Sequence, residues 1–189
     1  MTRVIAGRSK GRRLQVPSGL TTRPTADRAR EGLFSSLLSL LELEGARVLD
    51  LYAGSGALGL EAVSRGAGCA TLVENDPDAV AVLRANVELL ALPGVQVVAQ
   101  PVEGFLAAGV GGEQAQRYDL ALLDPPYDLD VAGVLALLHP WLAADAVVAL
   151  ERRTRGPELS WPEGFQAVRS RRYGEATFWY AIGAGKSLC

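Results

Sequence analysis

Apolar residues along most of the chain occur in short runs, and segments with helical spacing separate them. From residue 47 onward the runs have the length of β-strands, and the segments between them carry an apolar residue every three or four positions. The strands are predicted over residues 47–52, 69–74, 95–99, 118–123 and 146–151. Helices are predicted up to about residue 65 and over 78–90, 102–108 and 131–138. This alternation predicts an α/β fold, in which helices cover both faces of a parallel sheet.

Two further strands are expected near the end of the chain, over residues 165–173 and 176–182. No helical pattern separates them, and Gly174 stands between them, which is typical of a hairpin. The closing hairpin should add one antiparallel strand to the sheet.

The first 45 residues follow a different pattern. Residues 4–6 and 14–16 are predicted as two short strands around a basic turn at residues 8–11. A helix then begins near Pro24 with Thr25 as its N-cap, and Gly45 ends it. The helix carries a buried stripe at helical spacing, made of Leu33, Phe34, Leu37, Leu38 and Leu41. We therefore divide the chain into a basic N-terminal hairpin, residues 1–22, and a main domain, residues 23–189, that includes a lead-in helix over 25–44.

The charge of the chain is divided between these two parts. Among 189 residues the net charge is −2, but residues 1–30 hold eight basic residues and one acid, a balance of +7. The remainder holds 11 basic and 20 acidic residues, a balance of −9. A basic segment on an acidic body suggests a partner that is itself charged, such as a nucleic acid.

Several classes of protein are excluded at this stage. No apolar run reaches the length of a membrane span, and no apolar segment follows the basic N-terminus as in a secretory signal. Cys69 and Cys189 are far apart, so we expect neither a disulfide framework nor a zinc site, and we expect a cytoplasmic protein. His139 is the single histidine, which leaves little material for a His-centred triad or a metal site.

A glycine-rich segment follows the first strand of the alternating part. It contains Asp50, Gly54, Gly56 and Gly59, and it should lie in the crevice where open α/β sheets bind ligands. Glycines let the backbone turn tightly and approach a ligand closely. The spacing also matches the dinucleotide fingerprint, and Glu74 follows Gly54 by 20 residues, as a ribose-binding acid would. The motif alone leaves a nicotinamide dinucleotide and another adenosine cofactor both open.

Charge around this motif favours S-adenosylmethionine. A carboxylate at Asp50 would complement an ammonium-bearing cofactor and repel a pyrophosphate. Residues 50–64 contain no Lys or Arg that could bind phosphates. Glu74 would then accept hydrogen bonds from both ribose hydroxyls.

A second motif, Asp124-Pro125-Pro126-Tyr127, ends the fourth strand. Proline offers no N–H, so the pair terminates the strand and fixes a carboxylate, a carbonyl and an aromatic ring in a small volume. These groups suit an exocyclic amino group on a planar base. Asp124 and the Pro125 carbonyl would accept its two N–H groups and stabilise positive charge on the nitrogen, and Tyr127 would stack on the base.

These motifs, together with the N-terminal segment, resemble one known family. The resemblance runs from residue 2 to 182 and is carried by DLYAGSGALGLEA and DPPY, by Arg3-Val-Ile-Ala-Gly7 and Lys10-Gly11-Arg12, and by Thr22-Arg23-Pro24-Thr25, Asp27-Arg28, Arg30-Glu31 and Leu33-Phe34. The chain is similar here to the RsmD family of bacterial 16S rRNA guanine-N2 methyltransferases. That resemblance implies a Rossmann-like class I methyltransferase fold with a seven-stranded, mostly parallel sheet and an antiparallel last strand. It also implies S-adenosylmethionine as cofactor and one guanine of 16S rRNA, in an assembled or assembling small subunit, as target.

The resemblance assigns roles to individual residues. It implies cofactor contacts by Asp50, Tyr52, Ala53, Gly54, Ser55, Gly56, Glu74, Asn75, Val102 and Asp124. It implies that the target base is held by Asp124, Pro125, Pro126 and Tyr127. Two places depart from the family pattern: Tyr173-Gly174-Glu175 carries Glu for Asp, and Pro101 stands where relatives carry a polar residue.

The basic residues near the N-terminus are candidates for contacts with RNA phosphates, which would position the RNA without reading its sequence. They are Arg3, Arg8, Lys10, Arg12, Arg13, Arg23, Arg28 and Arg30. Glycines at positions 7, 11 and 19 suggest a backbone that can follow a phosphate chain. A second group of arginines, which includes Arg152 and Arg153, would extend this surface if folding brings it near. We expect a monomer that acts without a metal.

Other functions share parts of this pattern. A DNA adenine-N6 methyltransferase or a protein-glutamine methyltransferase would use similar Pro-Pro-Tyr chemistry. A dinucleotide-dependent oxidoreductase would use the glycine motif, and a non-catalytic RNA-binding module would use the basic segment. The last two leave Asp124-Pro125-Pro126-Tyr127 without a role.

Overall fold

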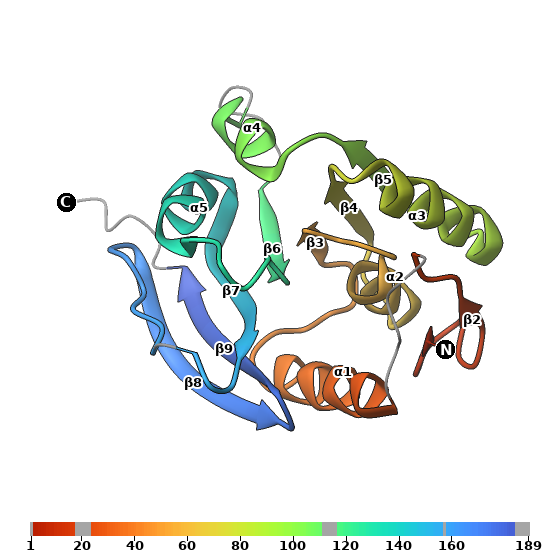
Figure 1. Cartoon of the computed structure of the whole chain (residues 1–189), viewed down its shortest axis with the longest axis horizontal. Helices are drawn as coiled ribbons and strands as arrows, with labels where there is room; N and C mark the ends of the chain where they lie inside the picture. The colour runs from red at the N-terminus through yellow and green to blue at the C-terminus, as the bar shows by residue number, and fades with distance from the viewer. Residues whose placement is uncertain (1, 18–23, 111–116, 157, 184–189) are drawn as a thin grey trace.

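A seven-stranded sheet forms the centre of the computed structural model, which describes residues 2–17, 24–110, 117–156 and 158–183 (Figure 1). The strand order is β5-β4-β3-β6-β7-β9-β8. The strands are β3 Arg47–Leu51, β4 Cys69–Glu74, β5 Val95–Ala99, β6 Tyr118–Leu123, β7 Leu142–Arg153, β8 Phe165–Tyr173 and β9 Ala176–Gly183. The first five strands in this order are parallel, and β9 runs antiparallel to both β7 and β8. The predicted sheet, with its antiparallel last strand, is confirmed.

Helices cover the two faces of this sheet (Figure 1). The first face packs against α1 Pro24–Leu37, α2 Ala57–Ser64 and α3 Pro77–Leu90, and the second against α4 Val102–Ala107 and α5 Val131–Leu138. Successive strand residues alternate between the two cores, because side chains on a strand point to opposite faces. Val48 and Leu72 lie in the first core, and their neighbours Leu49 and Val73 lie in the second. No helix in the described ranges is long and apolar enough to cross a membrane.

The N-terminal hairpin consists of β1 Thr2–Arg3 and β2 Arg13–Leu14, which pair antiparallel and lie beside α2 and α3 (Figure 1). The expected strands over 4–6 and 14–16 are therefore shifted and shortened. The physical reason is that Ile5 and Ala6 donate their backbone N–H groups to the Glu61 carboxylate, and Gln15 donates to Asn86. These residues bond to side chains of the helices instead of continuing the hairpin ladder. The boundary expected between residues 22 and 23 lies outside the described residues.

Helix α1 is shorter than the helix predicted over 25–44. It already includes Pro24, so Thr25 lies inside its first turn and is not the N-cap, and it ends at Leu37. The carbonyl of Ser36, which would accept the N–H of residue 40 in a longer helix, instead receives the N–H and hydroxyl of Ser39 and the guanidinium of Arg169. The chain therefore leaves the helix in turns, and Leu38 is 53% exposed.

Strand β7 begins at Leu142, four residues before the predicted start at 146. Its pairing with β6 shifts register between Tyr118 and Leu120, and Asp145 has φ of +60°. This irregularity is a bulge, which interrupts the alternation of apolar and polar residues. The predicted start of the strand depended on that alternation and was therefore placed too late.

Candidate active site

Four carboxylates stand at the carboxyl ends of four neighbouring strands. Asp50 lies in β3, Glu74 ends β4, Asp124 follows β6 and Glu151 lies in β7. Each is two residues after a residue of the first core, namely Val48, Leu72, Leu122 and Ala149, so all four side chains belong to the face covered by α1, α2 and α3. We call these four residues the acidic row.

The glycine-rich loop after β3 borders the acidic row. Gly54 and Gly56 have φ of +54° and +78°, a region that side-chain-bearing residues rarely adopt. A Cβ at Gly56 would come within 2.4 Å of Leu83 in α3, whereas a Cβ at Gly54 would meet nothing within 4 Å. Gly56 is thus required by packing. Gly54 presents its backbone to open space, as a cradle for a ligand requires.

Asp50 is buried against the start of α2. Its side chain is 1% exposed, and Oδ2 accepts the backbone N–H of Gly59 at 2.8 Å. Burial raises the pKa of its carboxyl to about 7, and the negative charges of Asp124 and Glu74 add to the effect. Asp50 therefore holds the start of α2 against β3, and its predicted contact with the cofactor stays a prediction.

Glu74 also binds the loop. Oε2 accepts the N–H of Gly54 at 2.8 Å, and Oε1 accepts the N–H groups of Asn75 and Asp76. Asp76 is the N-cap of α3, since its side chain accepts the N–H of Ala79. Glu74 is half-buried and retains acceptor capacity on Oε2, because a carboxylate oxygen accepts two hydrogen bonds.

The remaining predicted cofactor residues lie on both sides of this loop. Tyr52 has φ of +60°, and its hydroxyl donates to Glu103 at 3.0 Å, so it connects β3 to α4. Val102 is buried and begins α4, and Pro101 is the residue before the helix. The N–H of a first helical residue has no partner within its helix, so Val102 presents a donor at this edge of the sheet. Ser55 is held through its carbonyl by Asn86 of α3.

Asp124 is exposed, whereas the other three members of the acidic row are at least half-buried. Water reaches it directly, but protein surrounds it at longer range, and the resulting desolvation raises the pKa of its carboxyl to about 6. Burial, followed by the charge of Asp124, raises the pKa of Glu151 to about 8. Leu123 pairs in register with Leu150, so Asp124 and Glu151 follow side by side and the end of β7 belongs to the site.

The segment after Asp124 turns back toward β7. Pro125 is buried, Pro126 is exposed, and Tyr127 is 45% exposed. The guanidinium of Arg152 donates to carbonyls of this segment, and that of Arg153 lies 4.2 Å from the centre of the Tyr127 ring. Sequence reasoning missed these contacts. It assigned both arginines to an RNA surface and gave Glu151 no role, although Glu151 ends a strand predicted to lie in the same sheet and the two arginines follow it directly.

The residues present fit a cationic ligand. The ion pairs in the part of the chain that the structure describes involve none of the acidic row, and residues 50–64 contribute no Lys or Arg. Gly54 offers open backbone beside Glu74. A sulfonium or ammonium group is stabilised by such carboxylates, whereas a pyrophosphate would be repelled. Among the described residues, no group of three or more His, Cys, Asp or Glu has a metal-binding arrangement.

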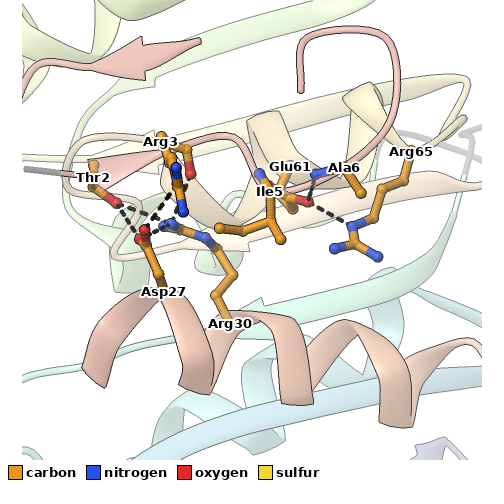
Figure 2. Close-up of polar contacts among 8 residues, drawn as sticks. All are labelled: Thr2, Arg3, Ile5, Ala6, Asp27, Arg30, Glu61 and Arg65. Atoms are coloured by element: carbon orange, nitrogen blue, oxygen red, sulfur yellow. Dashed lines mark hydrogen bonds and ion pairs between the residues drawn. The ribbon is translucent and has the colours of Figure 1, made fainter. Parts of the chain in front are cut away.

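The expected phosphate-binding residues fall into three groups. Arg8, Lys10, Arg12, Arg13 and Arg28 are exposed, although Arg12 also donates to the Leu89 carbonyl, and Arg23 lies outside the described residues. Arg3 is exposed and pairs with Asp27 at 3.5 Å. Arg30 corrects the prediction, because it is 5% exposed and its guanidinium binds Asp27, Thr2 and the Arg3 carbonyl. It fastens the hairpin to α1 and does not face solvent (Figure 2).

Glu61 makes the second attachment of the hairpin (Figure 2). Its side chain is fully buried and accepts the N–H groups of Ile5 and Ala6 and the guanidinium of Arg65 at 2.6 Å. Gly7 follows with φ of +80°, and a Cβ there would lie 1.7 Å from the Ser64 carbonyl. Close contact with α2 therefore requires this glycine, which the sequence had suggested was there to follow a phosphate chain.

The Tyr173-Gly174-Glu175 motif forms the turn between β8 and β9. The Tyr173 ring packs so closely on α1 that a Cβ at Gly32 would lie 2.2 Å from it. The carbonyl of Glu175 accepts the N–H of Thr154 at 2.8 Å, and that of Gly174 accepts the Thr154 hydroxyl. The motif thus joins the end of β7 to the last strand.

Comparisons with known proteins cover nearly the full chain. A family model described as conserved hypothetical protein 95 matches residues 2–182. The protein named ribosomal RNA small subunit methyltransferase D from Escherichia coli (strain K12) is 34% identical over 179 residues, which cover 93% of this chain and 87% of that protein. The solved structure "Putative methyltransferase yhhF from Escherichia coli" has a TM-score of 0.84 at 34% identity, covering 98% of this chain and 99% of that chain. The solved structure of a hypothetical protein of Thermus thermophilus has a TM-score of 0.79 at 36% identity, covering 95% and 98%. The similarity therefore includes the hairpin as well as the sheet.

Proposed function

The chain belongs to the RsmD family, whose model is described as conserved hypothetical protein 95, and we propose that it methylates the N2 amino group of one guanine in small-subunit (16S) ribosomal RNA, with S-adenosylmethionine as methyl donor. The single observation that carries this proposal is the exposed Asp124, at the head of a Pro-Pro-Tyr segment and beside three further carboxylates. A nucleophilic amino group requires acceptors at this place, and a cationic donor requires negative charge.

The cofactor would lie against the glycine-rich loop. When bound, S-adenosylmethionine supplies a methyl group on a positively charged sulfur, and this sulfur is the leaving group when an amino nitrogen attacks the methyl carbon. Glu74 is placed to bind the ribose through the acceptor capacity left on Oε2, and Gly54 to offer its backbone. Asp50 keeps the loop in place by holding the Gly59 N–H. Val102 is placed to donate its N–H to the adenine.

The target base would lie against the Asp124–Tyr127 segment. Asp124 and the Pro125 carbonyl, to which no described residue donates, would accept the two N–H groups of the guanine N2. Accepting both favours the geometry in which the nitrogen lone pair points outward, and it stabilises the positive charge that develops there. A carboxyl whose pKa is raised to about 6 is also suited to take the proton that the nitrogen releases. Tyr127, which is 45% exposed, offers a face on which the base can stack.

The RNA would be held by phosphate contacts away from the base. The exposed residues Arg8, Lys10, Arg12, Arg13 and Arg28 would supply these contacts. They carry no base-reading geometry, so selection of one guanine falls to the shape of the RNA or of the assembling small subunit. We propose that the protein acts in the cytoplasm, where its substrate would be made, and that it acts as a monomer.

Replacing Asp124 tests the mechanism. Asp124→Asn removes the carboxylate but keeps the shape of the side chain, so kcat for methyl transfer should fall by about 100-fold or more, while S-adenosylhomocysteine binds within threefold of wild type. Small ribosomal subunits from cells that lack this protein serve as substrate, and the modified nucleotide is mapped. The matched control is Asp128→Asn, an exposed acid in the same segment.

Two results would contradict the proposal. Wild-type turnover by Asp124→Asn would remove this carboxylate from the mechanism. Methyl incorporation into DNA or protein, with none into ribosomal RNA, would show that the substrate class is wrong.

A further inference from the structure

The segment after Asp124 lies beyond the ordered pairing of the sheet. Pairing between β6 and β7 ends at Leu123 and Leu150, and the two prolines that follow have no N–H with which to continue it. One backbone bond closes the turn, from the N–H of Leu129 to the carbonyl of Pro126 at 3.1 Å. The base-binding segment therefore needs other groups to fix its position.

Arg152 supplies them from the end of β7. Its guanidinium donates to three carbonyls of the segment: Nη2 to Tyr127 at 2.9 Å, and Nη1 to Leu129 at 3.3 Å and Pro126 at 3.4 Å. A guanidinium carries five N–H donors in one plane, so a single arginine can satisfy several carbonyls that no strand pairs. Arg152 is half-buried, which strengthens these bonds relative to those of a fully solvated side chain.

Arg153 contacts the same segment on the opposite face of the sheet. β7 pairs with β9 without interruption from Val147 to Arg153, so consecutive side chains at its end point to opposite faces. Arg152 shares the face of Leu150, which packs with α5, and Arg153 shares the face of the acidic row. There its guanidinium lies 4.2 Å from the centre of the Tyr127 ring, in cation–π geometry.

We propose that Arg152 and Arg153, which we name the β7 clamp, are positioning residues for the target base. Arg152 fixes the backbone of the segment, and with it the direction of the Pro125 carbonyl. Arg153 supports one face of the Tyr127 ring, which leaves the opposite face for the base. This inference rests on the proposed function, because it assigns the clamp to the site where the guanine would bind.

The clamp itself is held by the last strand. Arg152 and Arg153 pair in register with Thr177 and Ala176 of β9, and the next residue, Thr154, donates its N–H to the Glu175 carbonyl. A residue can position another group only when it is itself fixed. The pairing with β9 fixes the backbone of Arg152 and Arg153.

The experiment measures kcat for methyl transfer, KM for the RNA substrate and the affinity for S-adenosylhomocysteine. Arg152→Ala should lower kcat by about 100-fold, because a displacement of about 1 Å at a reacting group has an effect of that size. Affinity for S-adenosylhomocysteine should stay within twofold, since the clamp does not touch the glycine-rich loop. Arg152→Lys, which keeps the charge and loses the planar fork, should recover part of the lost kcat. Arg153→Leu should raise the KM for RNA more than it lowers kcat.

Arg155→Ala is the matched control, since it removes the same charge near the end of β7 from an exposed side chain. It should leave kcat within twofold of wild type. Wild-type kcat in Arg152→Ala, or an equal loss in Arg155→Ala, would overturn the clamp. If Arg152→Ala does not fold, Arg152→Lys takes its place, and wild-type kcat in that variant would overturn the clamp. Absence of methyl transfer by the wild-type protein would instead contradict the proposed function, so the two failures are distinguishable.

Discussion

At the scale of single residues, the Asp50 carboxylate holds a backbone group of the glycine-rich loop in place. It accepts the Gly59 N–H at 2.8 Å and is almost completely buried. Because burial raises its pKa to about 7, the folded protein binds a proton there at pH values at which the unfolded chain has released it. The free energy of unfolding therefore falls as pH rises from about 4 to about 7, where Asp50 becomes ionised in both states.

This predicts that Asp50→Asn stabilises the protein at pH 8. The amide oxygen still accepts the Gly59 N–H, and no charge is left buried, so the free energy of unfolding should rise by about 1–3 kcal/mol at pH 8 and by less at pH 5. Chemical denaturation at both pH values measures this effect. Glu88→Gln, an exposed acid on α3, is the control and should change stability little. A loss of stability at pH 8 would show that Asp50 is stabilised as an anion.

Sequence alone predicted where the candidate residues lie in the sheet better than which groups they contact. Asp124 was placed correctly beside the glycine-rich loop, because both motifs end parallel strands and the carboxyl ends of parallel strands share one edge of the sheet. The partner of Asp50 was not predictable, since the Gly59 N–H returns to it through the folded geometry of the loop. Glu151 was missed for a related reason: its proximity to Asp124 depends on which strand lies beside β6.

At the scale of elements, the hairpin is attached to α1 and α2 by buried polar groups. Glu61 is 0% exposed and accepts two backbone N–H groups of the hairpin as well as the guanidinium of Arg65. On α1, Arg30 and Asp27 bind Thr2 and Arg3 of the hairpin (Figure 2). Several residues that carried the resemblance to the RsmD family belong to these two attachments. Part of the family's sequence pattern therefore serves to attach the hairpin to the main domain.

Replacing Glu61 should loosen the hairpin. Glu61→Gln leaves one side-chain acceptor for two backbone N–H groups, removes the partner of Arg65 and buries an amide donor, so we expect a loss of about 3 kcal/mol. Amide hydrogen exchange of Ile5 and Ala6 should accelerate more than exchange in the sheet. Glu42→Gln, an exposed acid after α1, is the control. Unchanged exchange at Ile5 and Ala6 would contradict the assigned role of Glu61.

The elements of the alternating part were predictable to within a few residues, and those of the N-terminal part less so. Strands β4, β5, β6 and β8 have the predicted bounds, because the first three are mostly apolar runs and Gly174 marks the end of β8. The hairpin strands and the end of α1 depend on single side chains distant in sequence. Ser36 is bonded by Arg169, 133 residues away, and Ile5 by Glu61, 56 residues away. No local pattern contains that information.

At the scale of the whole molecule, the division of charge persists in the fold but is smaller on the surface than in the sequence. Arg30 is withdrawn into an ion pair with Asp27, and Arg3 pairs with the same acid. The exposed positive charge of the hairpin is carried by Arg8, Lys10, Arg12 and Arg13. The acidic row lies on the sheet, so under the proposed function the phosphates and the target base would bind at different places.

Neutralising part of the hairpin should weaken RNA binding without altering the site. The triple variant Arg8→Gln, Lys10→Gln and Arg13→Gln spares Arg12, whose guanidinium also binds the Leu89 carbonyl. Each lost phosphate contact should reduce the slope of log affinity against log salt by about 0.7–0.9. Arg84→Gln, an exposed arginine on α3, is the control. A salt slope equal to that of wild type would exclude the hairpin from the RNA-binding surface.

Strand β9 is the last strand among the described residues, but it lies inside the sheet, between β7 and β8. A chain synthesised only as far as residue 175 has both motifs but leaves β7 as an open edge, with nothing in register beside Arg152 and Arg153. Strand order therefore makes the position of Arg152 and Arg153 depend on β9, which the chain reaches only after both motifs.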